Sequence, residues 1–218
     1  MAQTSYLERR EQIEAYFDRT AADAWARLTS DAPVSGVRAT VRAGREQMRR
    51  LLVDWISSAD SSAGLSTDTP LLSRSLLDAG CGTGLLAVDC ARLGAAVTAI
   101  DLSPGSVRLL AGDMLDPALG EFDHLVAMDS LIHYAPAQAL AALSEVVPRV
   151  RRSIVFTFAP GSLPLRAMMA VGRLFPRGDR SPSIVPVAPQ RMHPAVGVAD
   201  AHRGEGVAVV ATPPGHQA

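Results

Sequence analysis

The 218-residue chain carries 21 basic and 22 acidic residues, for a formal net charge of −1 at pH 7, and 48% of its residues are hydrophobic. This length suits one well-buried domain, and the composition excludes an intrinsically disordered protein. The near-zero net charge argues against a nucleic-acid-binding protein, and the two cysteines are too few for a disulfide framework and fit a reducing, cytoplasmic compartment.

Two amphipathic helices are predicted in the first 60 residues. Apolar side chains recur at helical spacing in residues 5–30, and a second helical pattern follows in residues 37–56. Every basic residue in the chain is arginine, and several of them lie along the second pattern, namely Arg38, Arg42, Arg45, Arg49 and Arg50. These arginines have two interpretations, a solvated helix face or a positive wall beside an acidic ligand. Residues 57–70, rich in Ser, Thr, Gly and Asp, are interpreted as a linker.

From residue 75 onward the chain alternates between strand and helix patterns. Strands are predicted at 75–79, 96–100, 122–128 and 153–158, with helices at 83–93 and about 137–147. This alternation predicts a mostly parallel, doubly wound α/β sheet. After residue 182 the sequence is rich in Pro, Gly and Ala, and only 206–212 has a strand pattern. No segment resembles a cleaved signal or has the roughly 20 apolar residues of a membrane span, so we expect a soluble or peripheral protein.

The strongest local motif is LLDAGCGTG at residues 76–84, where a strand runs into a glycine-rich turn. It contains an acid and three glycines, namely Asp78, Gly80, Gly82 and Gly84. Glycine permits the unusual backbone angles and close ligand approach that such a turn requires. A dinucleotide-binding fingerprint would place its third glycine one residue later, which argues against a nicotinamide-dependent dehydrogenase. The spacing found here resembles motif I of S-adenosylmethionine-dependent methyltransferases.

Two further acids follow at positions that suit the same cofactor. Asp101 lies at the end of the second predicted strand, where such folds place a carboxylate on ribose hydroxyls. Gly112, Asp113 and Met114 resemble the "GD" element of the methyltransferases, whose acid meets the adenine amino group. Taken singly, residues such as Asp101 and Asp113 are more often turn or cap residues, and only the set with the glycine-rich turn points to cofactor binding.

Longer stretches narrow the resemblance to one family. They are YFDRTAADAWARL (16–28), VRATVRAGREQMRRLL (37–52), MLDPALGEFDHLVAMDSLIHY (114–134) and FTFAPGSLPLRAMMAVGRLFPRGDRSPSIVP (156–186). Together they resemble the magnesium-protoporphyrin IX O-methyltransferases of bacteriochlorophyll biosynthesis. The resemblance implies a Rossmann-like class I methyltransferase fold, with an N-terminal helical cap at 1–60 and an S-adenosylmethionine-binding domain at 61–187. Residues 188–218 are expected to form an irregular tail.

The resemblance also implies a reaction, methyl transfer from S-adenosylmethionine to a propionate carboxylate of Mg-protoporphyrin IX. A carboxylate is already nucleophilic at pH 7, so the enzyme chiefly positions the reactants and excludes water. His133 is the expected catalytic residue, acting on the propionate or on the substrate's Mg²⁺, with a structural histidine as the alternative. Substrate contacts are expected from Tyr16, Phe17, Trp25, Arg38, Arg42 and Arg45.

Further expectations concern metals, partners and location. The other histidines lack metal-ligand spacing, so no protein-bound metal is expected. The resemblance implies the large subunit of magnesium chelatase as a partner. Peripheral association with photosynthetic membranes stays open, because the substrate is apolar.

The chain departs from the family pattern in two places. Only eleven residues separate Asp101 from Asp113, whereas a parallel crossover needs a dozen or more, so one crossover helix is expected to be missing. The C-terminal strands of the family are also expected to be missing, since the resemblance ends near residue 187. We therefore expect reduced stability, and two alternatives to the enzyme remain. One is a non-catalytic remnant that binds S-adenosyl ligand or porphyrin without turnover, and the other is a methyltransferase for another small carboxylate or amine.

Overall fold

The computed structural model describes residues 5–16, 36–60, 68–102, 110–159, 184–186 and 207–211. Six strands in this part of the chain form one sheet with the order β3-β2-β1-β4-β5-β6. The five strands β1 to β5 pair in parallel, and β6 pairs antiparallel with β5, which confirms the predicted mostly parallel α/β architecture. Their bounds are β1 Ser75–Ala79, β2 Ala96–Asp101, β3 Leu110–Ala111, β4 Phe122–Ala127, β5 Val150–Thr157 and β6 Val207–Ala211.

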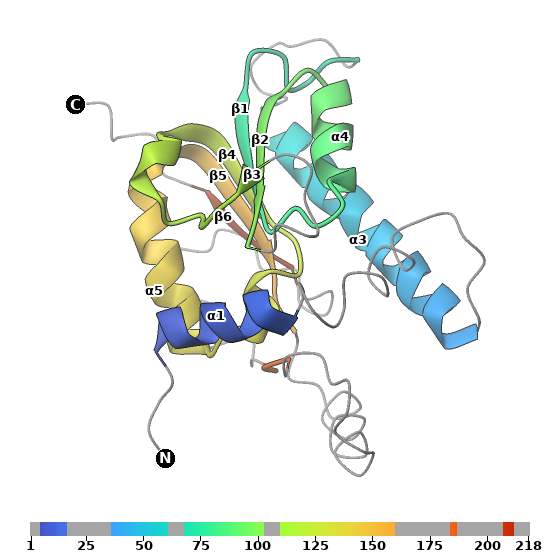
Figure 1. Cartoon of the computed structure of the whole chain (residues 1–218). Coiled ribbons are helices and arrows are strands. Elements are labelled where there is room, and N and C mark those ends of the chain that lie inside the picture. Colours follow the sequence, from blue (N-terminus) through green and yellow to red (C-terminus); the bar gives the residue numbers. More distant parts are fainter. Residues whose placement is uncertain are drawn as a thin grey trace.

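Helices cover both faces of this sheet. Helices α3 and α4 pack on one face and α5 on the other, while α1 lies across the end at which the parallel strands finish (Figure 1). Short 3₁₀ turns η3, η4 and η5 lie beside β4 and α5. The bounds are α1 Tyr6–Tyr16, α3 Gly36–Asp60, α4 Leu85–Arg92, α5 Pro136–Val146, η3 Pro117–Leu119, η4 Leu131–His133 and η5 Val147–Arg149.

Helix α3 is longer than the sequence pattern predicted. The linker predicted at 57–70 is wrong for residues 57–60, which form the end of this helix. Leu52 and Ile56 are fully buried one turn apart, and the Ser58 hydroxyl donates to the Asp54 carbonyl at 2.7 Å. Because this face of α3 packs against the sheet, the helix continues into residues 57–60, whose composition is typical of a linker.

Each face of the sheet has its own apolar core. Leu76 of β1 packs in the cluster that contains Leu52, Ile56 and Leu86 from α3 and α4. Its neighbour Leu77 points to the opposite face, into the cluster that contains Leu143 of α5 and Ile13 of α1. Because successive strand side chains alternate between faces, a strand covered by helices on both sides is apolar throughout.

The connection between β2 and β3 is short, as the sequence spacing predicted. Eight residues, 102–109, join the two strands, and 103–109 lie outside the described residues. β3 pairs with β2 only through Leu110 and Ala111, opposite Ile100 and Asp101. Because β3 pairs with only the last two residues of β2, a connection of this length has only a short way to return along the sheet for the strands to be parallel.

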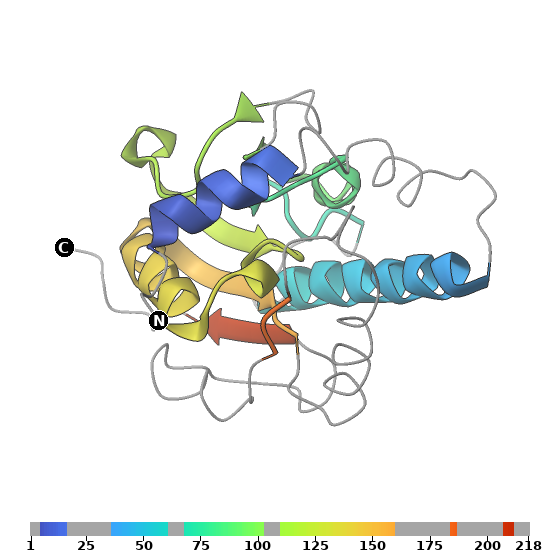
Figure 2. The same ribbon diagram turned by 60° about the horizontal axis from the view of Figure 1, so that its bottom comes forward.

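The last strand corrects an expectation about the C-terminus. The C-terminal strands were expected to be missing and residues 188–218 irregular, but β6 pairs with β5 from Ser153 to Thr157. The strand predicted at 206–212 is thereby confirmed, and Figure 2 shows it at the edge of the sheet. None of the helices in the described ranges is long and apolar enough to cross a membrane.

Candidate functional site

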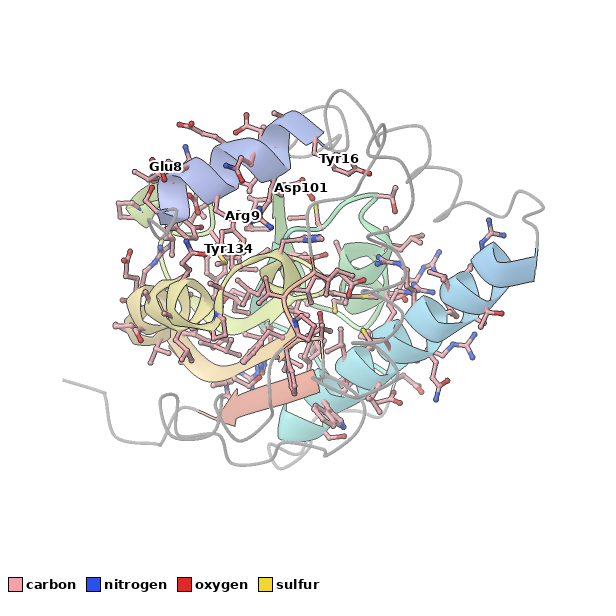
Figure 3. All side chains as sticks on the ribbon, turned by 90° about the horizontal axis from the view of Figure 1, so that it is seen from below. Glu8, Arg9, Tyr16, Asp101 and Tyr134 are labelled. Carbon is pink, nitrogen blue, oxygen red and sulfur yellow. The ribbon has the colours of Figure 1, made fainter. Side chains whose placement is uncertain are left out.

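A cavity of about 980 Å³ lies where the parallel strands end. Its floor comes from the segments that follow β1, β2, β3 and β4, and its walls come from α1 and α3. In open parallel sheets, ligands bind at the carboxyl ends of the strands, at the point where the strand order reverses. β1 lies at this point, between β2 and β4. Figure 3 looks onto this edge of the sheet, with Asp101 beneath α1.

The glycine-rich turn forms the floor beside β1. Gly80 has φ +86°, and a Cβ at this position would lie 2.5 Å from the Ser130 Cβ, so only glycine fits. The Gly82 amide donates to Asp101 Oδ2 at 2.8 Å, which joins the turn to the end of β2. Gly84 has φ +78° at the N-cap of α4 and does not line the cavity. The turn thus brings the backbone of Gly80 and Gly82 close to the space that a ligand would occupy.

Asp78 and Ser130 line this space, and each carries a buried polar atom. Asp78 is 1% exposed, and burial together with the nearby Asp101 raises its pKa to about 7. Asp78 Oδ2 and Ser130 Oγ are both buried and have no hydrogen-bond partner within the described part of the chain. Such atoms are costly unless a ligand or water satisfies them. They therefore fit a ligand that carries ammonium and hydroxyl donors.

Two side chains of α1 bind the Asp113 carboxylate. Arg10 Nη1 lies 2.9 Å from Asp113 Oδ2, and the Tyr6 hydroxyl donates to Asp113 Oδ1 at 3.2 Å. The hydrogen bond to Asp113 raises the pKa of Arg10, and burial raises the pKa of Tyr6. The acid predicted to meet adenine thus also anchors the N-terminal helix.

His133 lies in η4, directly after β4, and is 6% exposed. Its carbonyl accepts a hydrogen bond from Arg9 Nε at 2.9 Å, and in Figure 3 Arg9 points from α1 toward Tyr134. Tyr6 stacks on Tyr134, with ring centroids 5.1 Å apart. Burial raises the pKa of Tyr134 to about 12, so its hydroxyl stays protonated at neutral pH. α1 therefore contacts both the predicted cofactor acid and the predicted catalytic turn.

The arginines of α3 form the opposite wall. Arg42, Arg45 and Arg49 line the cavity, which favours the positive wall over a fully solvated face. Acidic partners compensate part of this charge, since Arg45 pairs with Asp129 and Arg49 with Asp89 and Glu46. The hydrogen bond from Arg49 keeps the pKa of Glu46 below its usual value.

Most of the predicted site residues line this one cavity. They are Asp78, Gly80, Gly82, Asp101, Asp113, Met114, Arg42, Arg45 and His133. Tyr16, the last residue of α1, does not line it and lies at the far end of that helix from Glu8 (Figure 3). Phe17 and Trp25 lie outside the described residues, as does the side chain of Arg38.

Five residues that line the cavity and bear on its chemistry are not among the site residues expected from the sequence. They are Tyr6, Ile13, Glu14, Ser130 and Tyr134. Helical spacing places Tyr6, Arg10 and Ile13 on one face of α1. This pattern predicts that the helix packs against the protein, but it does not predict which residues it contacts. Ser130 and Tyr134 are the first and last residues of the SLIHY segment, where proximity to His133 was the available signal. Among the described residues, no group of three or more His, Cys, Asp or Glu could hold a metal ion.

Comparison with solved structures supports the fold. The chain matches the crystal structure of magnesium protoporphyrin IX methyltransferase from Synechocystis PCC 6803 with bound SAH, with a TM-score of 0.74 and 24% identity. The match covers 93% of this chain and 98% of that chain. The fold is therefore that of a class I methyltransferase.

Comparison with protein families and curated sequences identifies the family. Residues 77–149 match a methyltransferase domain, and residues 127–209 match the magnesium-protoporphyrin IX methyltransferase C-terminus. The second match corrects the expectation that the resemblance ends near residue 187. A magnesium-protoporphyrin O-methyltransferase from Synechocystis is 29% identical over 180 residues, covering 75% of this chain and 74% of that relative. Another, from Rhodobacter capsulatus, is 44% identical over 201 residues and covers 85% of both chains. This chain belongs to the magnesium-protoporphyrin O-methyltransferase family.

Proposed function

We propose that this chain transfers a methyl group from S-adenosylmethionine to a propionate carboxylate of Mg-protoporphyrin IX, forming the monomethyl ester. One observation carries the proposal, the division of a single cavity into an acidic and a basic side. Acids at the ends of the strands suit a cationic methyl donor, and arginines of α3 suit an anionic acceptor. Family membership supports the same reaction.

The acidic side suits S-adenosylmethionine. Asp78 and Ser130 offer unsatisfied polar atoms to the methionine part, and Asp101 and Asp113 offer carboxylates to the ribose and adenine parts. S-adenosylmethionine supplies the methyl group, whose bond to sulfur breaks with its electrons left on sulfur as the carboxylate oxygen bonds to the methyl carbon. The residues of the chain orient both groups and exclude water, because a carboxylate needs no base.

The basic side suits the porphyrin propionates. Arg42 and Arg45 supply guanidinium groups that bind carboxylates through charge-assisted hydrogen bonds. His133 lines the same cavity, where its imidazole could hold the acceptor propionate or contact the Mg²⁺ of the substrate. Contacts from Tyr16, Trp25 and Arg38 stay predictions, as does the division between a cap at 1–60 and the cofactor-binding domain that follows it.

The direct test is an end-point assay of the purified chain with S-adenosylmethionine and Mg-protoporphyrin IX. We expect the monomethyl ester by chromatography, and no product when the metal-free or propionate-esterified porphyrin is supplied. Calorimetry with S-adenosylhomocysteine, run in parallel, separates the alternatives. Binding without turnover would mean that the chain is a non-catalytic remnant and not an enzyme. The observation that supports this alternative is the short β2–β3 connection.

Two wider proposals follow from family membership. The large subunit of magnesium chelatase is the proposed partner, because it would hold the Mg-porphyrin before this reaction. The proposed location is the cytoplasm, with peripheral contact to photosynthetic membranes. Co-purification of the two proteins with the porphyrin present, and fractionation of native cells, would test them.

A further inference from the structure

We propose that Asp129 and Thr157 are positioning residues for the acceptor, because together they hold the Arg45 guanidinium in one orientation at the cavity. The inference rests on the proposed function, since Arg45 belongs to the basic side of that cavity. It goes beyond that function by assigning a part in methyl transfer to two residues that no sequence pattern singled out. Neither residue takes part in the bond changes, and both act through Arg45.

Asp129 has an unusual backbone conformation shortly after the end of β4. Its φ is +58°, in the left-handed region that few residues other than glycine adopt. Such conformations persist where the surrounding structure holds them, and they cluster at functional sites. Here the Asp129 amide donates to Thr157 Oγ1 at 2.7 Å. The last residue of β5 therefore holds the backbone of Asp129 where that residue lines the cavity.

The Asp129 side chain is held at both carboxylate oxygens. The Thr157 hydroxyl donates to Oδ1 at 3.4 Å, and Arg45 Nη1 pairs with Oδ2. Thr157 is 1% exposed and does not line the cavity, so it is not placed to contact a ligand there. A buried hydroxyl on β5, a carboxylate after β4 and a guanidinium on α3 thus form one continuous chain of hydrogen bonds.

This chain of hydrogen bonds limits the orientations that Arg45 can adopt. A guanidinium is planar and presents its donors in a fixed fork, so its orientation decides where a bound carboxylate lies. Without the contact to Asp129, the long arginine side chain would sample more rotamers. Methyl transfer needs the acceptor oxygen in line with the breaking carbon–sulfur bond, and small displacements cost large factors in rate. Asp129 and Thr157 therefore affect kcat through the orientation of Arg45.

Asp129 also lowers the attraction of the basic side for an anion. Its negative charge lies beside Arg45 and partly cancels the field of that arginine. Loss of the charge should therefore strengthen binding of a propionate while it weakens the alignment of that propionate. A substitution that lowers kcat without raising KM acts on the transition state and not on ground-state binding. Opposite effects on the two constants thus separate positioning from a general loss of structure.

The first test is a steady-state assay of Asp129→Asn with S-adenosylmethionine and Mg-protoporphyrin IX. Asparagine keeps the size of the side chain and is one of the residues that adopt positive φ. We expect kcat to fall about tenfold and KM for the porphyrin to stay equal or fall, because alignment is lost and attraction is not. The dissociation constant of S-adenosylhomocysteine should change less than about twofold. Glu145→Gln, on the exposed face of α5 outside the cavity, is the matched control and should change none of these constants.

Thr157 provides a second test in which no charge is altered. Thr157→Val removes the hydroxyl with little change in shape, so kcat should fall about fivefold, the usual effect of losing one neutral hydrogen bond. Thr157→Ser keeps the hydroxyl and should restore kcat to within about twofold of the unmodified chain. Because neither variant changes the Asp129 side chain, this pair decides the matter even if Asp129→Asn fails to fold.

A double-mutant cycle shows whether Asp129 acts through Arg45. When Arg45→Gln is already present, adding Asp129→Asn should change kcat less than about twofold, since no guanidinium remains to be held. Independent effects of the two substitutions on kcat would overturn the inference.

Three other results would also overturn it. They are an unchanged kcat in folded Asp129→Asn, a raised KM together with weaker S-adenosylhomocysteine binding in that variant, and equal kcat in Thr157→Val and Thr157→Ser. Failure of the unmodified chain to form any ester would instead overturn the proposed function. The two failures are therefore distinguishable.

Discussion

The four aspartates of the cavity differ in what surrounds each carboxyl group. Asp113 and Asp129 face arginines from α1 and α3, and Asp101 accepts a hydrogen bond from the glycine turn. Asp78 is buried with an acid as its charged neighbour. One residue type therefore serves two purposes here, to anchor the walls of the cavity and to supply a site for positive charge.

The stability of the ligand-free chain should depend on pH through Asp78. Its folded pKa, about 7, lies above its ordinary value of 3.8, so the folded state binds more protons between these values and loses stability as pH rises. Asp78→Asn should therefore raise the melting temperature at pH 8 and change it little at pH 4. The expected gain is on the order of 4 kcal/mol. Thermal melts at both pH values check this, and an equal shift at both would contradict it.

Arg45 should control binding of the acceptor. Replacing it with glutamine removes a guanidinium from the cavity and leaves Asp129 uncompensated, so an anionic substrate is attracted less. We expect Arg45→Gln to raise KM for Mg-protoporphyrin IX at least tenfold, the usual effect of losing one charged hydrogen bond. The dissociation constant for S-adenosylhomocysteine should change less than about twofold, since the variant spares the acidic side.

Arg92→Gln is the matched control for this variant. Arg92 lies on α4, its side chain is 76% exposed, and it does not line the cavity. It should behave as the unmodified chain. A normal KM in Arg45→Gln together with weakened S-adenosylhomocysteine binding would show that Arg45 acts on the other side of the cavity.

At the scale of whole elements, α1 joins two parts of the site that are distant in sequence. Tyr6 and Arg10 contact Asp113, and Arg9 contacts the His133 carbonyl. Ile13 is buried in the core beneath the same helix. A helix of only eleven residues is marginal alone, so these contacts hold it in place.

Loss of the Arg10–Asp113 pair should loosen α1. The pair is partly exposed, so we expect Arg10→Gln to weaken docking by about 1 kcal/mol. Hydrogen exchange of residues 6–16 should then be roughly fivefold faster, with α5 unaffected. Glu11→Gln on the exposed face of α1 is the control and should exchange as the unmodified chain does. Unchanged protection in Arg10→Gln would mean that Ile13 and Tyr6 alone hold the helix.

At the scale of the whole molecule, the sheet is complete where the sequence suggested gaps. β3 has only two residues, yet they position Gly112, whose amide donates to the Asp101 carbonyl at 2.9 Å, and Asp113 beside it. At the other edge, β6 covers β5, whose Ile154, Val155 and Phe156 are fully buried. The short strand β3 is therefore sufficient to place Asp113 on the acidic side of the cavity.

Removal of β6 should destabilise the sheet. A chain that ends at residue 205 leaves the edge of β5 unpaired, a template for association between chains. We expect a loss of about 2 kcal/mol, a melting temperature lower by roughly 4–8 °C, and aggregation on light scattering. Truncation at residue 212 keeps β6 and is the control. Equal behaviour of the two truncations would show that β6 adds no stability.

Much of the sheet could be predicted because its signals are local. The apolar runs of β1, β2, β4 and β5, and the glycine turn between β1 and α4, each lie within about ten residues. The end of α3 and the pairing of β6 could not be predicted in this way. The end of α3 depends on contacts of Ile56 with the sheet, and β6 pairs with residues 50 or more positions earlier.

The sequence by itself determined the parallel α/β fold, the family and nine residues that line one cavity, because strand periodicity, glycine spacing and family motifs are written in consecutive residues. Only the tertiary structure decided which partner each of the cavity's charged groups has. Arg10 meets Asp113, Arg45 meets Asp129, and Asp78 meets Asp101. These pairs join elements far apart along the chain, and pKa and charge compensation depend on distance and burial in space, which no local pattern specifies.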